Sequence, residues 1–228
     1  MLKDFSRGIL NFVLPPVCVC CNNVLDKNFD FVCSSCLAKL KKVDASHNIW
    51  GDRVHRVSFE GNALSLFWFV EGTEIQRILH ALKYSRMKSI GTLFGKMLGE
   101  EIAGRYGGHY DFAVPVPLHK SRLRERTYNQ SSYICRGIGG ALNIQPLEKC
   151  LKRTRYTKTQ TKLSINEREE NVRNAFELNQ KFNGLIRGKN IVLVDDVITT
   201  GSTILECARV LKNSGCGEIT ICSIALAE

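Results

Sequence analysis

Apolar residues in the first half of the chain recur at the spacing of strands and helices. Residues 56–60 and the apolar run 63–70 flank Gly61–Asn62, an arrangement typical of a hairpin. Thr73 then precedes a helical stretch, and Gln76 stands three residues later, as in a capping box. The periodicity indicates two consecutive helices. Their apolar faces are formed by Ile75, Ile78, Leu79 and Leu82, and by Ile90, Leu93, Phe94, Met97, Leu98 and Ile102.

From Asp111 onward the pattern changes to an alternation of strands and helices. Strands are predicted at 111–118, 189–196 and 218–226, and helices at 128–142 and 203–215. A polar and basic loop covers 151–176. Helices that alternate with strands in this way favour a parallel sheet covered on both faces. We therefore predict an α/β fold with a doubly wound parallel sheet.

The composition is that of an ordinary soluble protein. The chain has 228 residues, of which 44% are hydrophobic and 24% are charged. Its longest apolar runs fall far short of the roughly 20 residues that a membrane-spanning helix needs. The residues before Cys18 carry scattered charges and no small-residue cleavage site, which makes them a poor signal peptide. We expect a cytoplasmic protein with no membrane span.

Five of the ten cysteines lie between Cys18 and Cys36. Cys18 and Cys21 form one CxxC pair, and Cys33 and Cys36 form another. Four thiolates from two such pairs can surround a structural Zn²⁺ as a tetrahedron. Cys20 lies inside the first pair and could compete as a ligand. A disulfide pair or an iron–sulfur cluster are the alternatives to zinc.

The positive charge of the chain is concentrated in its middle. The formal net charge is +10, and residues 115–190 hold 16 Lys and Arg against 6 Asp and Glu. The rest of the chain holds 16 of each and sums to zero. Such a basic stretch attracts polyphosphates or nucleic acids, although it can also be no more than a solvated basic face.

The stretch "IVLVDDVITTGST", residues 191–203, combines an apolar strand with two carboxylates and a hydroxyl-rich loop. Ligands of open parallel sheets bind beyond the carboxyl ends of the strands, where Asp195 and Asp196 are expected. Gly201 allows a ligand to approach the backbone closely, and the unpaired amides of the helix that begins near Ser202 attract anions. The stretch thus offers a phosphate cradle beside two carboxylates that can hold vicinal hydroxyls or Mg²⁺.

This stretch resembles the phosphoribosyl-pyrophosphate (PRPP) signature of type I phosphoribosyltransferases. The resemblance implies that Asp195 and Asp196 bind the ribose hydroxyls. It also implies that the loop binds the 5-phosphate through Thr199, Thr200, Gly201, Ser202 and Thr203. Purine-salvage members of the superfamily have an acid where this chain has Thr199. A hydroxyl is a poor general base, so purine salvage is disfavoured.

Three segments together resemble the ComF family of competence-associated proteins: "PVPLHKSRLRERTYNQ", "TQTKLSINEREENVRNAF" and "IVLVDDVITTGST". The match extends over nearly the whole chain, including the N-terminal cysteines. Thr127 replaces a glycine that is usual in the family, and "KTQTKLS" also departs slightly from its pattern. The resemblance implies a pyrophosphate loop and a mobile loop that closes over PRPP. Their candidate residues are His119, Lys120, Arg122 and Arg126 for the first, and Lys158 and Gln160 for the second.

The resemblance implies a type I phosphoribosyltransferase-like domain at 46–228 and a zinc-finger module at 1–45. It also implies a role in natural transformation, in which PRPP binds with Mg²⁺ and the protein handles imported single-stranded DNA beside a helicase-type partner. Two alternatives stay open: an active phosphoribosyltransferase acting on a nucleobase or amine, and a PRPP sensor without catalysis. Trp50, Phe67, Trp68 and Phe69 could stack on bases, but aromatics at strand spacing usually belong to a core.

Overall fold

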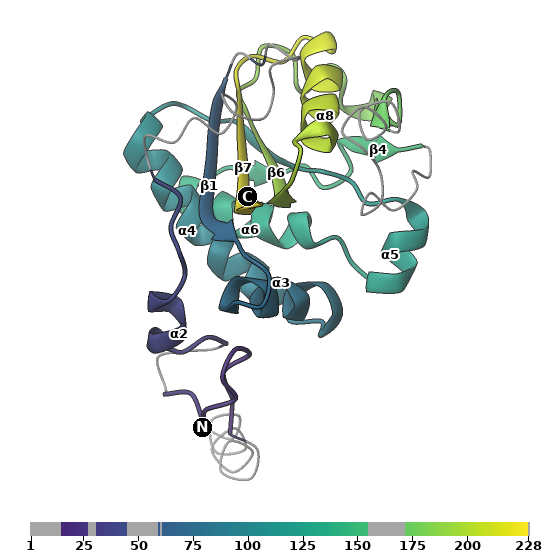
Figure 1. The fold of residues 1–228 in the computed structure, drawn as a ribbon. Helices are drawn as coiled ribbons and strands as arrows, with labels where there is room; N and C mark the ends of the chain where they lie inside the picture. Colours follow the sequence, from purple (N-terminus) through teal and green to yellow (C-terminus); the bar gives the residue numbers. More distant parts are fainter. Residues whose placement is uncertain (1–14, 27–30, 45–58, 60, 155–171, 228) are drawn as a thin grey trace, which may run out of the picture.

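The computed structural model describes residues 15–26, 31–44, 59, 61–154 and 172–227. Its centre is a five-stranded sheet with the strand order β1-β7-β6-β2-β3, in which every neighbouring pair is parallel (Figure 1). The strands are β1 (Asn62–Phe69), β2 (Phe112–Pro115), β3 (Gln145–Pro146), β6 (Ile191–Ile198) and β7 (Ile219–Ala227). The predicted parallel α/β fold is confirmed.

Both faces of the sheet are covered, as β6 illustrates. Val192 and Val194 belong to one buried cluster, which also contains residues of α3 (Glu74–Tyr84), α4 (Lys88–Tyr106) and α6 (Gln130–Leu142). Ile191 and Leu193 belong to the opposite cluster, which contains residues of α8 (Ser202–Asn213). Successive residues of a strand point to opposite faces, so a strand buried on both sides must be apolar throughout. The run from Ile191 to Val194 meets that requirement.

The predicted helices α4 and α6 pack closely because glycines lie at their crossing. A Cβ atom at Gly95 would collide with the backbone of Ile134, and one at Gly137 would collide with the backbone of Thr92. The apolar faces predicted for α3 and α4 are buried, apart from Leu93, which is 38% exposed, and Met97, which is half-buried. None of the helices within the described residues is both long and apolar enough to cross a bilayer.

Two local predictions are wrong. Asn62 is the first residue of β1 instead of part of a turn, and β1 pairs in parallel with the distant strand β7. The other arm of the expected hairpin lies outside the described residues, except for Phe59. The capping box at Thr73 does not form, because the Gln76 side chain accepts a hydrogen bond from the Gly72 amide and the Thr73 hydroxyl donates to the Val70 carbonyl.

The basic loop predicted at 151–176 begins and ends in short strands. β4 (Leu151–Arg153) and β5 (Phe176–Leu178) form an antiparallel pair beside the main sheet. Residues 155–171, which include Lys158 and Gln160, lie outside the described residues. The strand pair brings the two ends of this segment together.

The cysteine-rich N-terminal part packs against the main sheet. It contains the short helix α2 (Ser34–Ala38), and Leu25, Val32 and Leu40 share a core with α3 and β1. The Val43 amide donates to the Leu66 carbonyl at 3.0 Å, so the segment after α2 covers the free edge of β1. An edge strand that is covered in this way is protected against pairing with a strand of another chain. A domain boundary near residue 45 stays a prediction, since 45–58 lie outside the described residues.

Candidate functional site

The two predicted carboxylates lie inside β6, which continues for two residues beyond them to Ile198. The Ser131 hydroxyl, in the first turn of α6, donates to Asp195 Oδ1 at 3.2 Å. The backbone amide of Asp196 donates to the same oxygen at 2.8 Å. Burial, followed by repulsion from the Asp196 carboxylate, raises the pKa of Asp195 to about 7. A carboxyl group shifted this far is typical of functional sites.

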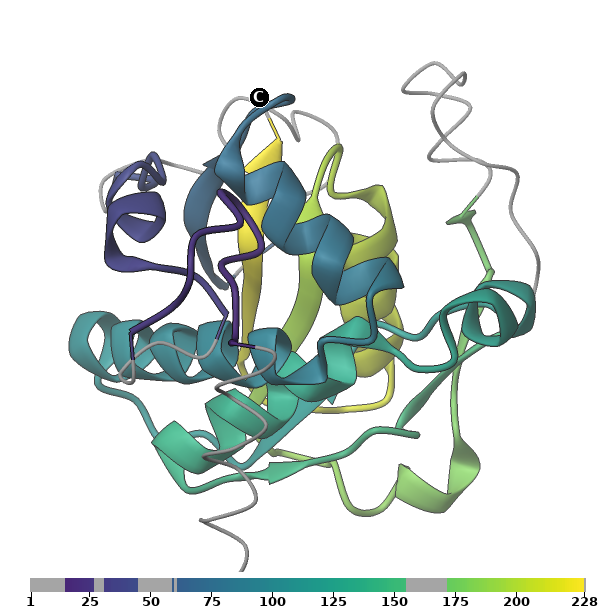
Figure 2. The same ribbon diagram turned by 90° about the horizontal axis from the view of Figure 1, so that it is seen from below.

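Asp196 is held from a different element. Its Oδ2 lies 3.2 Å from Nζ of Lys83, in the last turn of α3, and the side chains of Asp196 and Lys83 are only 13% and 22% exposed. In Figure 2, which views the molecule from below, α3 crosses in front of the strands of the sheet. The second carboxylate of the pair therefore has a cation as a neighbour.

The hydroxyl-rich loop leads directly into α8. Gly201 is the N-cap residue of this helix and has a φ of 79°, a left-handed conformation that favours glycine. Glycine has no side chain with which to cap the helix, so the first amides of α8 are left for another acceptor. The hydroxyls of Thr200 and Ser202 lie 3.0 Å apart, and Thr199 is exposed while Thr203 is half-buried.

The predicted pyrophosphate loop forms a short helix, α5 (Lys120–Arg126), with His119 as its N-cap. The Ser121 amide donates to His119 Nδ1 at 3.2 Å, so His119 caps this helix. Lys120 is exposed, whereas Arg122 lies 3.4 Å from the Glu125 carboxylate. Within α5 and its cap, His119 and Arg122 thus have partners from the same short helix.

Arg126 connects α5 to the carboxylates. Its Nη1 donates to Oε1 of Gln130 at 3.1 Å, and Gln130 precedes Ser131, the partner of Asp195. Arg126 Nε and Gln130 Nε2 are buried and have no hydrogen-bond partner among the described residues. Buried polar atoms are normally paired, so these two donors are suited to an acceptor brought by a ligand.

Four cysteines form a second candidate site. The Sγ atoms of Cys18, Cys21, Cys33 and Cys36 all lie within 4.8 Å of one another. Those of Cys21 and Cys33 are 3.8 Å apart, and a tetrahedron with Zn–S distances of about 2.3 Å requires sulfur separations of about 3.8 Å. Cys20 points elsewhere, with its thiol 3.7 Å from the Glu74 carbonyl. The cluster could therefore hold a metal such as zinc without Cys20.

The environment of the cluster favours thiolate formation at Cys18 and Cys33. Backbone amides of Cys20 and Cys33, each 3.4 Å from Cys18 Sγ, outweigh burial and lower the pKa of the Cys18 thiol. A hydrogen bond with the Ser35 hydroxyl, at 3.1 Å, lowers the pKa of the Cys33 thiol to about 6. Burial raises the pKa of Cys36. A bound cation would stabilise all four thiolates, because metal coordination deprotonates cysteine.

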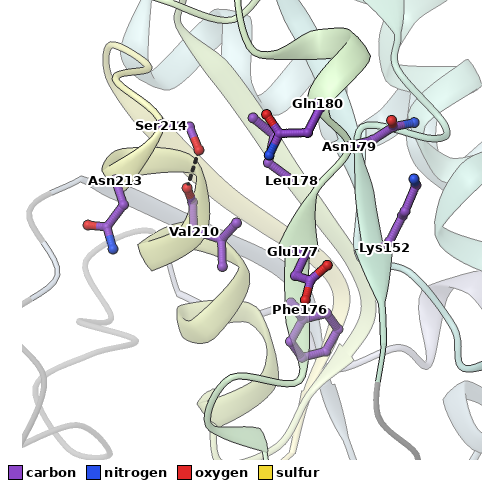
Figure 3. A pocket seen from close by; sticks show the side chains of 9 residues that line it. All are labelled: Lys152, Phe176, Glu177, Leu178, Asn179, Gln180, Val210, Asn213 and Ser214. Carbon is purple, nitrogen blue, oxygen red and sulfur yellow. Dashed lines mark hydrogen bonds between the residues drawn. The ribbon is translucent and has the colours of Figure 1, made fainter.

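A separate hollow of about 430 Å³ lies between the β4–β5 pair and the second half of α8 (Figure 3). Its lining includes Lys152, Glu177, Asn179 and Val210. Lys152 and Glu177 are opposite each other in the strand pair. Among the residues that the structure describes, none of those predicted for a site from the sequence lines this hollow.

The sequence analysis missed two residues that contact the carboxylates, Lys83 and Ser131. A signal for Lys83 was present, because residues 75–99 contain five Lys and Arg and no acidic residue. This local excess is concealed when charges are summed over the whole segment outside 115–190. Ser131 had no distinguishing signal, because its contact with Asp195 depends on how α6 packs beside β6.

Comparison with known proteins finds a family match that includes the sheet edge. Residues 145–227, which contain both carboxylates and the hydroxyl-rich loop, match the phosphoribosyl transferase domain family. The chain is 36% identical over 148 residues to DNA utilization protein YhgH of Escherichia coli K12, a match that covers 63% of each chain. It is 39% identical over 114 residues to competence protein F of Haemophilus influenzae, covering 50% of this chain and 49% of that protein.

These matches span less than two thirds of the length of either relative. Among solved structures, a glutamine PRPP amidotransferase of B. subtilis, complexed with ADP and GMP, aligns with a TM-score of 0.44 and 25% identity. That alignment covers 63% of this chain and 30% of the amidotransferase. The three segments noted in the sequence, the domain match over residues 145–227 and the named relatives together support a ComF family protein that carries a phosphoribosyltransferase-type domain.

Proposed function

We propose that the chain binds PRPP together with Mg²⁺ where β6 meets α8, and that it takes part in handling imported single-stranded DNA in the cytoplasm. The observation that carries the PRPP proposal is the pair Asp195–Asp196 followed by an uncapped helix start at Gly201. Carboxylates accept hydrogen bonds from vicinal hydroxyls, and the first amides of a helix donate hydrogen bonds to the oxygens of a phosphate. A phosphorylated ribose presents both groups at once.

The residues around this edge suit the rest of PRPP. Lys120, Arg122 and Arg126 would face the pyrophosphate, and the unpaired Nε of Arg126 provides a donor for one of its oxygens. Lys83 adds a further cation next to Asp196. A bound Mg²⁺ would neutralise part of the pyrophosphate charge. Lys158 and Gln160 keep their proposed place in the loop between β4 and β5.

Calorimetry tests the site. Replacing both carboxylates, Asp195→Ala with Asp196→Ala, should weaken PRPP binding by about 100-fold or more, because hydrogen bonds to charged groups contribute roughly 1.5–3 kcal/mol each. Glu100→Ala, which removes an exposed acid on α4, is the matched control and should bind as the unaltered protein does. Full PRPP affinity in the double variant would refute the site.

Whether the chain also transfers the phosphoribosyl group is a separate question. An active transferase acting on a nucleobase or amine would release pyrophosphate with a defined acceptor, whereas a sensor would bind PRPP without release. The absence of an acid at Thr199 favours a role outside purine salvage. Pyrophosphate release assayed across a panel of nucleobases and amines separates the two alternatives.

The DNA-handling role rests on the competence and DNA-utilization relatives and on the basic composition of 115–190. It predicts affinity for single-stranded DNA that falls steeply as salt concentration rises, because phosphate contacts release counterions. A helicase-type competence protein is the proposed partner. An absence of DNA binding at low salt would refute the DNA-handling proposal without affecting the proposal of a PRPP site.

The cysteine cluster is proposed to hold a structural Zn²⁺ through Cys18, Cys21, Cys33 and Cys36. All four positions of a tetrahedral ion would be occupied by thiolates. A closed site of this kind stabilises the fold and leaves no open position for catalysis.

A further inference from the structure

Tyr84 is an exposed aromatic residue at the end of α3, directly after Lys83, which pairs with Asp196. Tyr84 is 47% exposed, and the other Phe, Tyr and Trp side chains of the described residues are buried or partly buried. Phe67, by contrast, is 3% exposed and packs edge-on against Phe94 in the core. Of the aromatics considered from the sequence, Trp50 lies outside the described residues, and Trp68 and Phe69 are half-buried.

The exposure of Tyr84 is not a consequence of helix packing. The buried face of α3 consists of Ile75, Ile78, Leu79, Ala81 and Leu82, and Tyr84 is not part of it. A tyrosine left outside the core at a helix end provides a large, flat and rigid surface with little conformational entropy to lose on binding. Tyr84 therefore has the exposure and rigidity expected of a side chain that contacts a ligand.

Two neighbours hold the ring in place. The His80 ring lies 4.8 Å away at an interplanar angle of 43°. The Arg126 guanidinium lies 5.6 Å from the centre of the Tyr84 ring, within the range of a cation–π interaction. Arg126 is in turn fixed by Gln130, so the ring is positioned by groups that connect to the Asp195 side of the site.

The position of Tyr84 relates it to the proposed PRPP site. It follows Lys83, whose ammonium group is 3.2 Å from Asp196. Cations lie near the ring, since the Arg126 guanidinium is 5.6 Å from its centre and residues 75–99 contain five Lys and Arg and no acid. Arg86 and Lys88 are exposed just beyond Tyr84, and Arg124 is exposed on α5, the helix that also carries Arg126.

We propose that Tyr84, flanked by His80 and Arg126, is a stacking platform for a nucleobase of single-stranded DNA. An exposed aromatic ring surrounded by cations is the combination by which proteins bind single strands, with bases stacked on the ring and phosphates attracted by Lys and Arg. A free nucleobase is uncharged and does not need the surrounding cations. Single-stranded DNA matches both the ring and the charge.

This inference deepens the proposed function and rests on its DNA-handling part. It places the strand at the end of α3, on the same edge of the sheet as the proposed PRPP site. The two ligands would then contact adjacent residues, with Lys83 next to the ribose-binding carboxylates and Tyr84 next to the DNA.

The test compares two probes by fluorescence anisotropy at low salt: a labelled oligothymidylate and an abasic oligomer of equal length. Base stacking on an aromatic contributes about 1–3 kcal/mol, so Tyr84→Ala should weaken oligothymidylate binding about 5- to 150-fold. Binding of the abasic oligomer should not change, because its phosphates contact only the cations. Tyr84→Phe keeps the ring and should retain the affinity.

Leu185→Ala removes another exposed apolar side chain and serves as the control, with no expected change. The inference is overturned if Tyr84→Ala binds oligothymidylate normally, or if it loses affinity for both probes equally. Displacement of the oligomer by an equal concentration of free thymidine would also overturn it. PRPP calorimetry on Tyr84→Ala should match the unaltered protein, because Gln130 still holds the Arg126 guanidinium. A failure of the platform is thereby distinguished from a failure of the PRPP site.

Discussion

At the scale of single residues, Asp195 shows how a buried carboxyl group opposes the stability of the fold. Its pKa in the folded protein is raised from 3.8 to about 7, so the folded state keeps a proton that the unfolded state has already lost. Stability therefore falls as pH rises through this interval, because the folded state binds more protons there than the unfolded state. Asp195 lowers stability most above pH 7, when its carboxyl group is charged in both states.

Asp195→Asn tests this reasoning. The amide oxygen of asparagine can accept the same hydrogen bonds from Ser131 and from the Asp196 amide without carrying a charge. We expect the variant to be more stable than the unaltered protein at about pH 8, by on the order of a few kcal/mol, and the two to be equal near pH 3. Urea unfolding across this pH range measures the difference. A difference in unfolding free energy between the two proteins that does not change with pH would contradict this reasoning.

At the scale of elements, Gly201 connects backbone conformation to ligand binding. A side chain in its left-handed conformation costs about 1–2 kcal/mol, so Gly201→Ala should lower the unfolding free energy by that amount. It should also weaken PRPP binding, because relaxation of the strain moves the first amides of α8. Gly188→Ala is the matched control: its φ is 67°, and a Cβ there would meet no atom within 4 Å. The Gly188→Ala variant should lose a similar amount of stability and keep its affinity for PRPP. An equal loss of PRPP affinity in both variants would refute the role of the α8 amides.

The elements also show what the sequence could and could not predict. Parallel strands and helices were predictable from local patterns, as in the uninterrupted apolar run from Ile191 to Val194. The pairing of β1 was not, because its partner β7 is distant in sequence: the buried Ser65–Ser223 hydrogen bond between them spans 158 of the 228 positions. Local turn residues at Gly61–Asn62 therefore suggested a hairpin. The identity of the acids was readable from their motif, whereas their partners Ser131 and Lys83 are determined by how α6 and α3 pack against the sheet.

At the scale of the whole molecule, α3 joins the two candidate sites. Its first turn contacts the cysteine-rich part, with Lys39 Nζ 3.9 Å from the Glu74 carboxylate and Arg77 Nη1 3.4 Å from the Cys20 carbonyl. Its last turn carries Lys83 and Tyr84, beside the carboxylates. The cysteine-rich N-terminal part therefore packs on the helix that also borders the proposed PRPP and DNA sites, and loss of its proposed metal should affect more than the N-terminal residues.

The metal ligands can be separated from the neighbouring thiol by paired variants. Cys33→Ser with Cys36→Ser should abolish bound zinc, measured by elemental analysis, and lower the thermal midpoint, because Leu25, Val32 and Leu40 share their core with α3 and β1. Cys20→Ser is the control and should keep its zinc, since the Cys20 thiol faces the Glu74 carbonyl outside the cluster. Because α3 contacts the module, oligothymidylate affinity should also decrease in the double variant. Zinc retained after both ligands are replaced, or lost from Cys20→Ser, would show that a different set of thiols holds the ion.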